Sequence, residues 1–135
     1  DSGIKKATAD TVAYLAQQLE RNPQLIEAAL AEIGNIALFG KKAFEQGDLS
    51  ALGEAMNANQ ALLAQLDLSC EALHQLIIAA RQAGALGAKL TGGGKGGNML
   101  ALVTPETQEA VRKALLSAGA VSIYQTNLKG VQDND

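Results

Sequence analysis

The stretch KLTGGGKGGNML, residues 89–100, is the part of the sequence whose residue types most directly indicate chemistry. Five of the six positions from Gly92 to Gly97 are glycine, Lys95 is the sixth, and apolar segments flank the run. Glycine loses more conformational entropy on folding than any other residue, so such a run indicates a backbone that bends sharply or approaches a ligand. Successive N–H groups in such a loop can bind an anion such as phosphate. The alternative is a flexible connection between two strands.

Two known phosphate-binding motifs do not fit this run. The Walker motif requires Ser or Thr after its lysine, whereas Gly96 follows Lys95. The spacing of Gly92, Gly94 and Gly97 matches GxGxxG, but that motif leads from a strand into a helix, and NMLALV is a poor start for a helix. We therefore predict a glycine loop that joins two strands.

Apolar spacing and capping residues predict four helices before this loop. The first starts at an N-cap, Thr8, the second at Asn22 with Pro23 in its first turn, the third at Asp48 and the fourth at Ser69. The residues expected to face the core on the first, second and fourth helices are Val12, Leu15, Ala16 and Leu19, then Leu25, Ala29, Ile33, Ile36 or Ala37, and Phe44, then Leu73, Leu76, Ile77 and Ala80.

The last third of the chain has a mixed pattern. AKLT (88–91) and NMLALVT (98–104) are expected to be strands, and a helix with Val111 and Leu115 facing the core is expected between Thr104 and Gly119. AVSIYQT (120–126) alternates apolar and polar residues and is expected to be a further strand. The sequence thus predicts a single α+β domain over residues 1–135, a small antiparallel sheet with helices packed on one face.

Composition limits the classes of partner. A net charge of −3 opposes nucleic-acid binding, and no apolar run is long enough to span a bilayer. Cys70 is the only cysteine and His74 the only histidine, so we expect no metal site and no disulfide in the chain. These features predict a cytoplasmic protein.

The segment GAKLTGGGKGGNMLALV resembles the third sequence motif of the GHMP kinases, and most of all that of the mevalonate kinase family. DSGIKKATADTV is similar to the start of the C-terminal domain in that family, and residues 57–94 are similar to the helix pair that leads into the motif. Two positions depart from the usual pattern. Lys95 stands where many members have another residue, often glycine, and Asp67 stands where a glycine is usual.

The resemblance implies a ferredoxin-like C-terminal domain of an enzyme that transfers the γ-phosphoryl group of ATP to the hydroxyl of mevalonate, or of a similar small alcohol, in isoprenoid precursor synthesis. It implies that the catalytic residues and the Mg²⁺ ligands lie in an N-terminal kinase domain, the partner of this chain, so the chain alone is expected to be inactive. It also allows a homodimer. Since the chain starts at Asp1 without an initiator Met, we interpret it as a piece of a longer protein.

The resemblance also implies site residues. Gly92, Gly93, Gly94, Lys95, Gly96 and Gly97 would lie beside the ATP phosphates, and Thr8, Lys5, Lys6, Asn59 and Gln60 would lie near the substrate. Structural roles without substrate contact remain open for these residues, because Thr8 could be a local helix cap and Lys5 and Lys6 could be hydrated surface residues. Lys95 is expected to be hydrated at the tip of the loop, so Gly94→Val should damage the enzyme far more than Lys95→Ala.

Two other functions remain open at this point. One is phosphomevalonate kinase or another GHMP small-molecule kinase, because the acceptor pocket would lie mostly outside this chain. The other is a non-catalytic ferredoxin-like module that binds an anion through the glycine loop.

Overall fold

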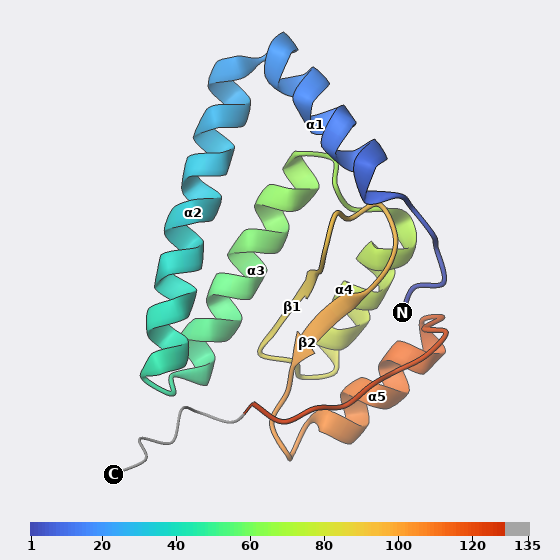
Figure 1. The fold of residues 1–135 in the computed structure, drawn as a ribbon. Coiled ribbons are helices and arrows are strands. Elements are labelled where there is room, and N and C mark those ends of the chain that lie inside the picture. Colours follow the sequence, from blue (N-terminus) through green and yellow to red (C-terminus); the bar gives the residue numbers. More distant parts are fainter. Residues whose placement is uncertain (129–135) are drawn as a thin grey trace.

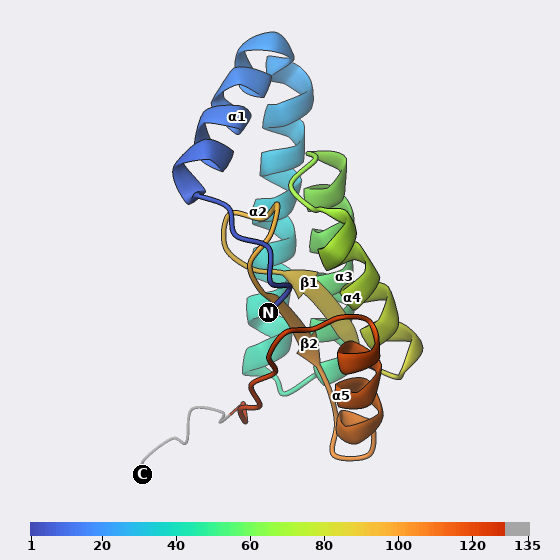
Figure 2. The same ribbon diagram turned by 90° about the vertical axis from the view of Figure 1, so that its right-hand side faces the viewer.

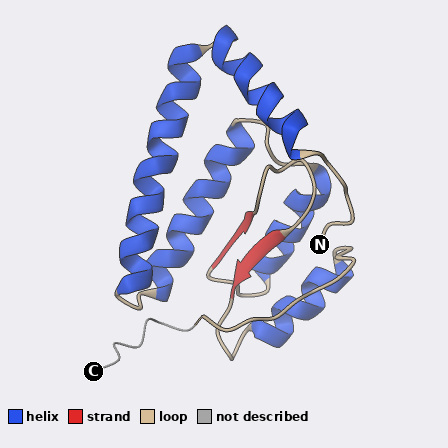
Figure 3. Cartoon of the chain, viewed as in Figure 1, coloured by secondary structure: helices blue, strands red, loops and turns tan. Residues whose placement is uncertain are grey.

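The computed structural model describes residues 1–128, and over this range it contains five helices and one two-stranded antiparallel sheet (Figures 1 and 3). In chain order the elements are α1 (Thr8–Arg21), α2 (Pro23–Glu45), α3 (Leu49–Gln65), α4 (Glu71–Gln82), β1 (Gly87–Leu90), β2 (Met99–Leu102) and α5 (Gln108–Ser117). This order confirms the α+β class and the two strands that were expected on either side of the glycine run.

Several helix ends lie where the capping residues predict them. α2 begins at Pro23 after Asn22, and the carboxylate of Asp48 accepts a 2.9 Å hydrogen bond from the backbone N–H of Ala51 at the start of α3. Thr8 is the first helical residue of α1 rather than its N-cap, and α4 starts at Glu71, two residues after Ser69.

The start of α5 also lies later than predicted, at Gln108 rather than beside Pro105. A turn comes first, in which the side-chain hydroxyl of Thr107 accepts a 3.1 Å hydrogen bond from the N–H of Thr104.

The buried faces of α1 and α2 agree only in part with those predicted. As expected, Leu15, Ala29 and Ile33 pack against a cluster of buried side chains that includes Ile26. Val12 and Leu19 are 62% and 37% exposed, and α1 buries Thr11 instead. Leu25 and Phe44 are also exposed, while α2 buries Ile26, Gly40 and Ala43. Figure 2 shows the reason for α1 and for Leu25: α1 and the adjoining end of α2 extend beyond the sheet, so fewer elements cover them. Apolar spacing predicts which residues share a face but not how much of that face finds a partner.

The main core lies between the sheet, α4 and α5. The four apolar residues predicted to face inward on α4 are all buried, namely Leu73, Leu76, Ile77 and Ala80. Leu76, Ile77 and Ala80 pack with Val111 and Leu115 of α5 against Ala88, which pairs with Ala101 across the hairpin. This confirms that helices cover one face of the sheet. The register places Lys89 opposite Leu100 on the other face.

Helix α3 runs along the outer edge of β1 and hydrogen-bonds to it with side chains. The amide oxygen of Asn57 accepts from the N–H of Ala88 at 3.1 Å, and that of Gln60 accepts from the N–H of Leu90 at 2.8 Å. The approach is close because Gly53 of α3 faces Gly87, where a Cβ atom would lie 2.5 Å from the carbonyl oxygen of Gly53. The strand that leads into the glycine loop is therefore fixed along its whole length.

The prediction of a strand over residues 120–126 is wrong: this segment is extended but is not part of the sheet. Val121 donates a 2.9 Å hydrogen bond to the carbonyl of Asp1, and the amino group of Asp1 donates to the carbonyl of Ser122 at 3.0 Å. A pocket of about 360 Å³ lies between the segment and β2, while the side-chain N–H of Gln125 donates to the side-chain oxygen of Gln108 in α5 at 3.0 Å. A strand needs backbone hydrogen bonds along its whole length, and within the described residues this segment makes them only with Asp1 and, from the N–H of Ala120, with Leu115.

Candidate functional site

The glycine loop, residues 91–98, connects β1 to β2 beside the start of α1 and the connection between α3 and α4 (Figures 1 and 2). A 3.0 Å hydrogen bond from the N–H of Thr91 to the carbonyl of Asn98 closes its base. Gly92, Gly94 and Gly97 have φ angles of 68°, 79° and 74°, in the left-handed region that residues with a Cβ atom rarely adopt. The sharp backbone bends that the glycine run predicts are thus present.

The loop is held in place by hydrogen bonds on two sides. The N–H of Lys95 donates to the carbonyl of Leu68 at 2.6 Å, and the N–H of Gly97 donates to the carbonyl of Ile4 at 2.7 Å. Ser2 adds two bonds to the carbonyl of Gly97, from its N–H at 2.9 Å and from its hydroxyl at 2.6 Å. The loop is therefore an ordered part of the fold rather than a flexible connection.

These internal bonds decide which backbone donors the loop can offer to a ligand. The amides of Lys95 and Gly97 are already used, whereas within residues 1–128 the amides of Gly92, Gly93, Gly94 and Gly96 have no hydrogen-bond partner. Such donors are suited to an anion, because each buried or partly covered N–H gains a partner when it binds.

The glycines of the loop differ in what a side chain would meet. A Cβ atom on Gly94 would collide with the carbonyl of Leu68, and one on Gly96 would lie 2.6 Å from the carbonyl oxygen of Ile4. Gly92 and Gly97 instead have nothing within 4 Å of such an atom. Gly94 is thus required by the packing of the protein itself, so the damage expected from Gly94→Val would not prove contact with a phosphate.

The prediction that Lys95 is hydrated at the tip of the loop is wrong. Its side chain is only 24% exposed. The ammonium lies 2.8 Å from a carboxylate oxygen of Asp67 and 4.5 Å from the centre of the Tyr14 ring. The hydrogen bond from Lys95, aided by a second from Tyr14, holds the pKa of Asp67 below its ordinary value. The two positions that depart from the family pattern therefore form an ion pair.

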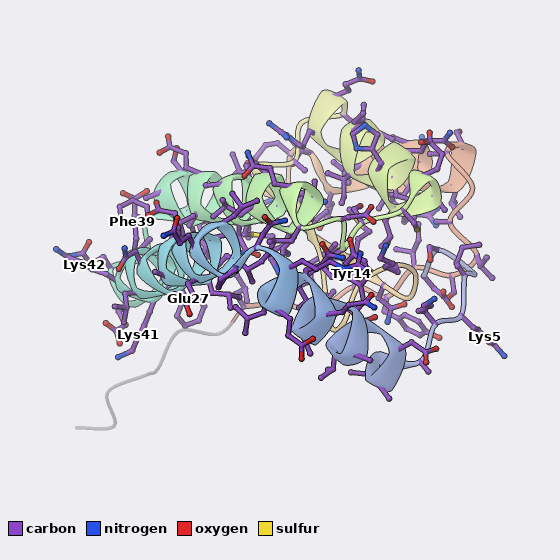
Figure 4. The ribbon with its side chains drawn as sticks, turned by 90° about the horizontal axis from the view of Figure 1, so that it is seen from above. Lys5, Tyr14, Glu27, Phe39, Lys41 and Lys42 are labelled. Carbon is purple, nitrogen blue, oxygen red and sulfur yellow. The ribbon has the colours of Figure 1, made fainter. Side chains whose placement is uncertain are left out.

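Of the residues expected near a substrate, Thr8 lies beside the loop. A Cβ atom on Gly93 would be 3.6 Å from the Cα atom of Thr8, so the start of α1 is in contact range of the glycine backbone. Lys5 and Lys6 are exposed on the segment before α1, and Figure 4 shows Lys5 projecting away from the molecule. The structure thus brings Thr8 to the loop but leaves the lysine pair on the surface.

The Asn59–Gln60 pair does not face the loop together. Gln60 is buried, with its side-chain oxygen bound to the N–H of Leu90, while Asn59 is partly exposed. In this structure Gln60 supports the last residue of β1, directly before the loop. Its role here is to position backbone.

Three residues near the loop were missed by the sequence analysis: Thr11, Tyr14 and Lys89. Thr11 is 3% exposed and its hydroxyl oxygen, 3.6 Å from where a Cβ on Gly93 would lie, has no partner among the described residues. Its spacing of three residues from both Thr8 and Tyr14 places all three on one helix face, a signal that could have identified them. Lys89 is half-buried and donates to the carbonyl of Leu90 at 2.8 Å, and burial lowers its pKa.

The donor set of the site suits an anion better than a metal ion. Within residues 1–128, no three His, Cys, Asp or Glu side chains gather where they could hold a metal. The carboxylate beside the loop, Asp67, is paired with Lys95.

No helix in the described part of the chain is long and apolar enough to cross a bilayer.

A family model described as "GHMP kinases C terminal" matches residues 41–121, which include α3, α4, the hairpin and α5. The chain belongs to this family. The matched range contains the whole glycine loop.

Comparison with individual proteins indicates which members of this family the chain resembles. The chain is 40% identical over 136 residues to a protein of Pyrococcus horikoshii named mevalonate kinase, covering 97% of this chain and 41% of that protein. It is also 40% identical over 105 residues to the mevalonate kinase of Aeropyrum pernix, covering 76% of this chain and 32% of the relative. The crystal structure of L. major mevalonate kinase in complex with R-mevalonate superimposes with a TM-score of 0.84 and 34% identity, over 87% of this chain and 36% of that one. The chain therefore spans about two fifths of the length of such relatives.

Proposed function

We propose that this chain is the C-terminal domain, residues 1–135, of an ATP-dependent mevalonate kinase, and that its glycine loop lines the site of the ATP phosphates. The observation that carries the proposal is the set of four glycine amides, those of Gly92, Gly93, Gly94 and Gly96, that have no partner in the described chain, in a loop held by hydrogen bonds on both sides. The similarity to proteins named mevalonate kinase, over nearly the whole chain, supports the choice of acceptor.

In this proposal the loop contributes positioning and charge stabilisation. Phosphoryl transfer spreads negative charge over the phosphate oxygens, and fixed N–H donors stabilise that charge without reorganising. The loop amides would bind these oxygens, and the start of α1 at Thr8 adds the partial positive charge of a helix N-terminus on the same side.

The described residues do not supply the remaining chemistry. They offer no cluster of carboxylates for Mg²⁺, which prefers oxygen ligands. We therefore place the general base, the metal ligands and most of the acceptor pocket in an N-terminal domain, and we expect the chain alone to be inactive. A cytoplasmic location and a homodimer are parts of the same proposal.

Gly92 and Gly47 allow a matched test of the loop. Both have left-handed backbones, with φ of 68° and 69°, and both have open space where a Cβ atom would be, but Gly47 lies in the turn between α2 and α3. Alanine at either position should cost about 1 kcal/mol of stability from backbone strain. Only Gly92→Ala places a methyl group at the proposed phosphate site.

In the full-length protein we expect Gly92→Ala to lower kcat/KM for ATP at least about tenfold, corresponding to about 1.4 kcal/mol, and Gly47→Ala to leave it unchanged. If the two variants had equal kcat/KM values and equal melting temperatures, the glycine loop would not be part of the nucleotide site. The acceptor is tested separately by assaying phosphoryl transfer to mevalonate, phosphomevalonate and galactose. Preference for phosphomevalonate or galactose would assign another GHMP kinase activity, and no transfer to any of them would favour an anion-binding module.

A further inference from the structure

Two residues other than glycine adopt a left-handed backbone in the described part of the chain. Asp67 and Lys95 both have φ of 57°. This conformation costs a residue with a Cβ atom roughly 1–2 kcal/mol, somewhat less for Asp, so something in the structure must hold both residues there. They lie 28 residues apart, Asp67 between α3 and α4 and Lys95 in the glycine loop.

The side chains of these two residues meet each other and a third residue. The Lys95 ammonium donates to Oδ2 of Asp67 at 2.8 Å, and the hydroxyl of Tyr14 donates to the same oxygen at 3.2 Å. The ammonium also lies 4.5 Å from the centre of the Tyr14 ring, within the range of a cation–π interaction. Figure 4 shows Tyr14 on the inner side of α1. The three residues thus link α1, the α3–α4 connection and the glycine loop.

A backbone bond runs parallel to this contact. The N–H of Lys95 donates to the carbonyl of Leu68, the residue after Asp67, at 2.6 Å. The same two segments are therefore joined once through side chains and once through backbone. One of the three N–H donors of the ammonium is bound to the carboxylate, and the ring and the carboxylate hold the ammonium toward α1 and the α3–α4 connection.

We propose that Tyr14, Asp67 and Lys95 form a latch that positions the glycine loop, keeping the amides of Gly93 and Gly96 open while Lys95 itself stays off the phosphate. This inference rests on the proposed function, since it assigns the loop a ligand. It makes Lys95 a positioning residue that acts through the backbone. The latch depends on charge, so salt should weaken it.

The latch can be measured without any kinase assay, through amide hydrogen exchange at residue 95 in the ligand-free full-length protein. Lys95→Met and Asp67→Asn should each make this amide exchange about five- to tenfold faster, because an ion pair and a cation–π contact no longer hold the loop. The double variant should add little to either single change. The amide of Leu90, bound to Gln60, is the internal control and should not change.

Three further variants separate a latch from general stabilisation. Lys95→Arg keeps the charge and can stack on Tyr14, so it should restore slow exchange. Tyr14→Phe removes one hydrogen bond but keeps the ring, so it should have a smaller effect than Asp67→Asn. Asp67→Gly with Lys95→Gly relieves the backbone strain, so it should leave the melting temperature near wild type while exchange at residue 95 is fast.

Kinetics then decide between a latch and direct contact. A latch predicts that Lys95→Met and Asp67→Asn raise KM for ATP by similar factors, since both release the same loop. The proposal is overturned if exchange at residue 95 is unchanged in Lys95→Met, or if Lys95→Met alone raises KM while Asp67→Asn does not, which would assign Lys95 to the phosphate. Should the wild-type protein phosphorylate no acceptor, the proposed function fails, but the exchange measurements still decide the latch.

Discussion

The side-chain oxygen of Gln60 and the backbone N–H of Leu90 form a 2.8 Å hydrogen bond that is buried between α3 and β1. Gln60→Met keeps the length of the side chain but removes the acceptor, leaving a buried donor unsatisfied at the end of the strand. We expect it to lower the free energy of unfolding by about 2 kcal/mol. Asn59→Ala, at the neighbouring and partly exposed position, should change it by less than about 0.5 kcal/mol. Urea denaturation measures both, and equal effects would contradict the structural role of Gln60.

Two helical glycines should respond to alanine in opposite directions. A Cβ atom on Gly53 would lie 2.6 Å from the carbonyl carbon of Leu86, which is backbone and cannot move aside, whereas one on Gly34 would meet nothing within 4 Å. Both substitutions improve helix propensity by about 1 kcal/mol. Gly34→Ala should therefore raise the melting temperature, while Gly53→Ala should cost about 3 kcal/mol or more. A stabilised Gly53→Ala variant would mean that α3 and β1 are not in backbone contact.

The buried hydroxyl of Thr11 gives a prediction about satisfied and unsatisfied polar groups. It has no hydrogen-bond partner among the described residues, so Thr11→Val should leave stability unchanged or raise it by up to about 1 kcal/mol. Thr107→Val is the matched change at a hydroxyl that does accept a bond, from Thr104, and should cost about 1 kcal/mol. Thermal unfolding of the two variants tests the contrast. A clear loss of stability in Thr11→Val would show that this hydroxyl is bonded in solution.

The pKa of Asp67 predicts a pH dependence of the loop. Hydrogen bonds from Lys95 and Tyr14 lower this pKa in the folded protein, so the carboxylate is favoured by folding. Its stabilising contribution is therefore present above the ordinary carboxylate pKa and is lost as the pH falls through the lowered, folded value. Because the carboxylate is largely exposed, solvent screens the effect and it should be small.

An NMR titration of the Asp67 carboxyl carbon measures this directly. Lys95→Met should return the pKa toward its ordinary value, and Lys95→Arg should keep it low. If the titration is the same in wild type and Lys95→Met, the ion pair does not form in solution.

The elements with strong local signals were predictable from sequence, and those that depend on distant partners were not. Asn22–Pro23 and Asp48 mark the starts of α2 and α3 because capping is local, and α4 shows its inward face because it is covered along its length. Val12 on α1 is apolar but exposed, because α1 lacks a neighbour on that side. The segment 120–126 has a strand pattern, but within the described residues no strand pairs with it, and its backbone bonds are to Asp1 and Leu115.

The candidate site likewise has features that the local sequence predicts and features that it does not. The glycine run shows by composition alone that the backbone bends there, and the φ angles agree. Lys95 looks like an exposed lysine in the sequence, because nothing local indicates that Asp67 and Tyr14 are beside it. The available signal was that this sequence departs from the family pattern at two positions, and that the residues there, Asp67 and Lys95, have opposite charges.

The contacts of α3 with β1 also determine how this sheet could grow. Asn57 and Gln60 occupy backbone groups that β1 would otherwise present to a neighbouring strand, so that edge is no template for edge-to-edge pairing. On the other side of the hairpin, β2 borders the pocket that separates it from residues 120–126, and Leu100 is 56% exposed. A strand that joins the sheet, from the same polypeptide or from another molecule during aggregation, must therefore add beside β2.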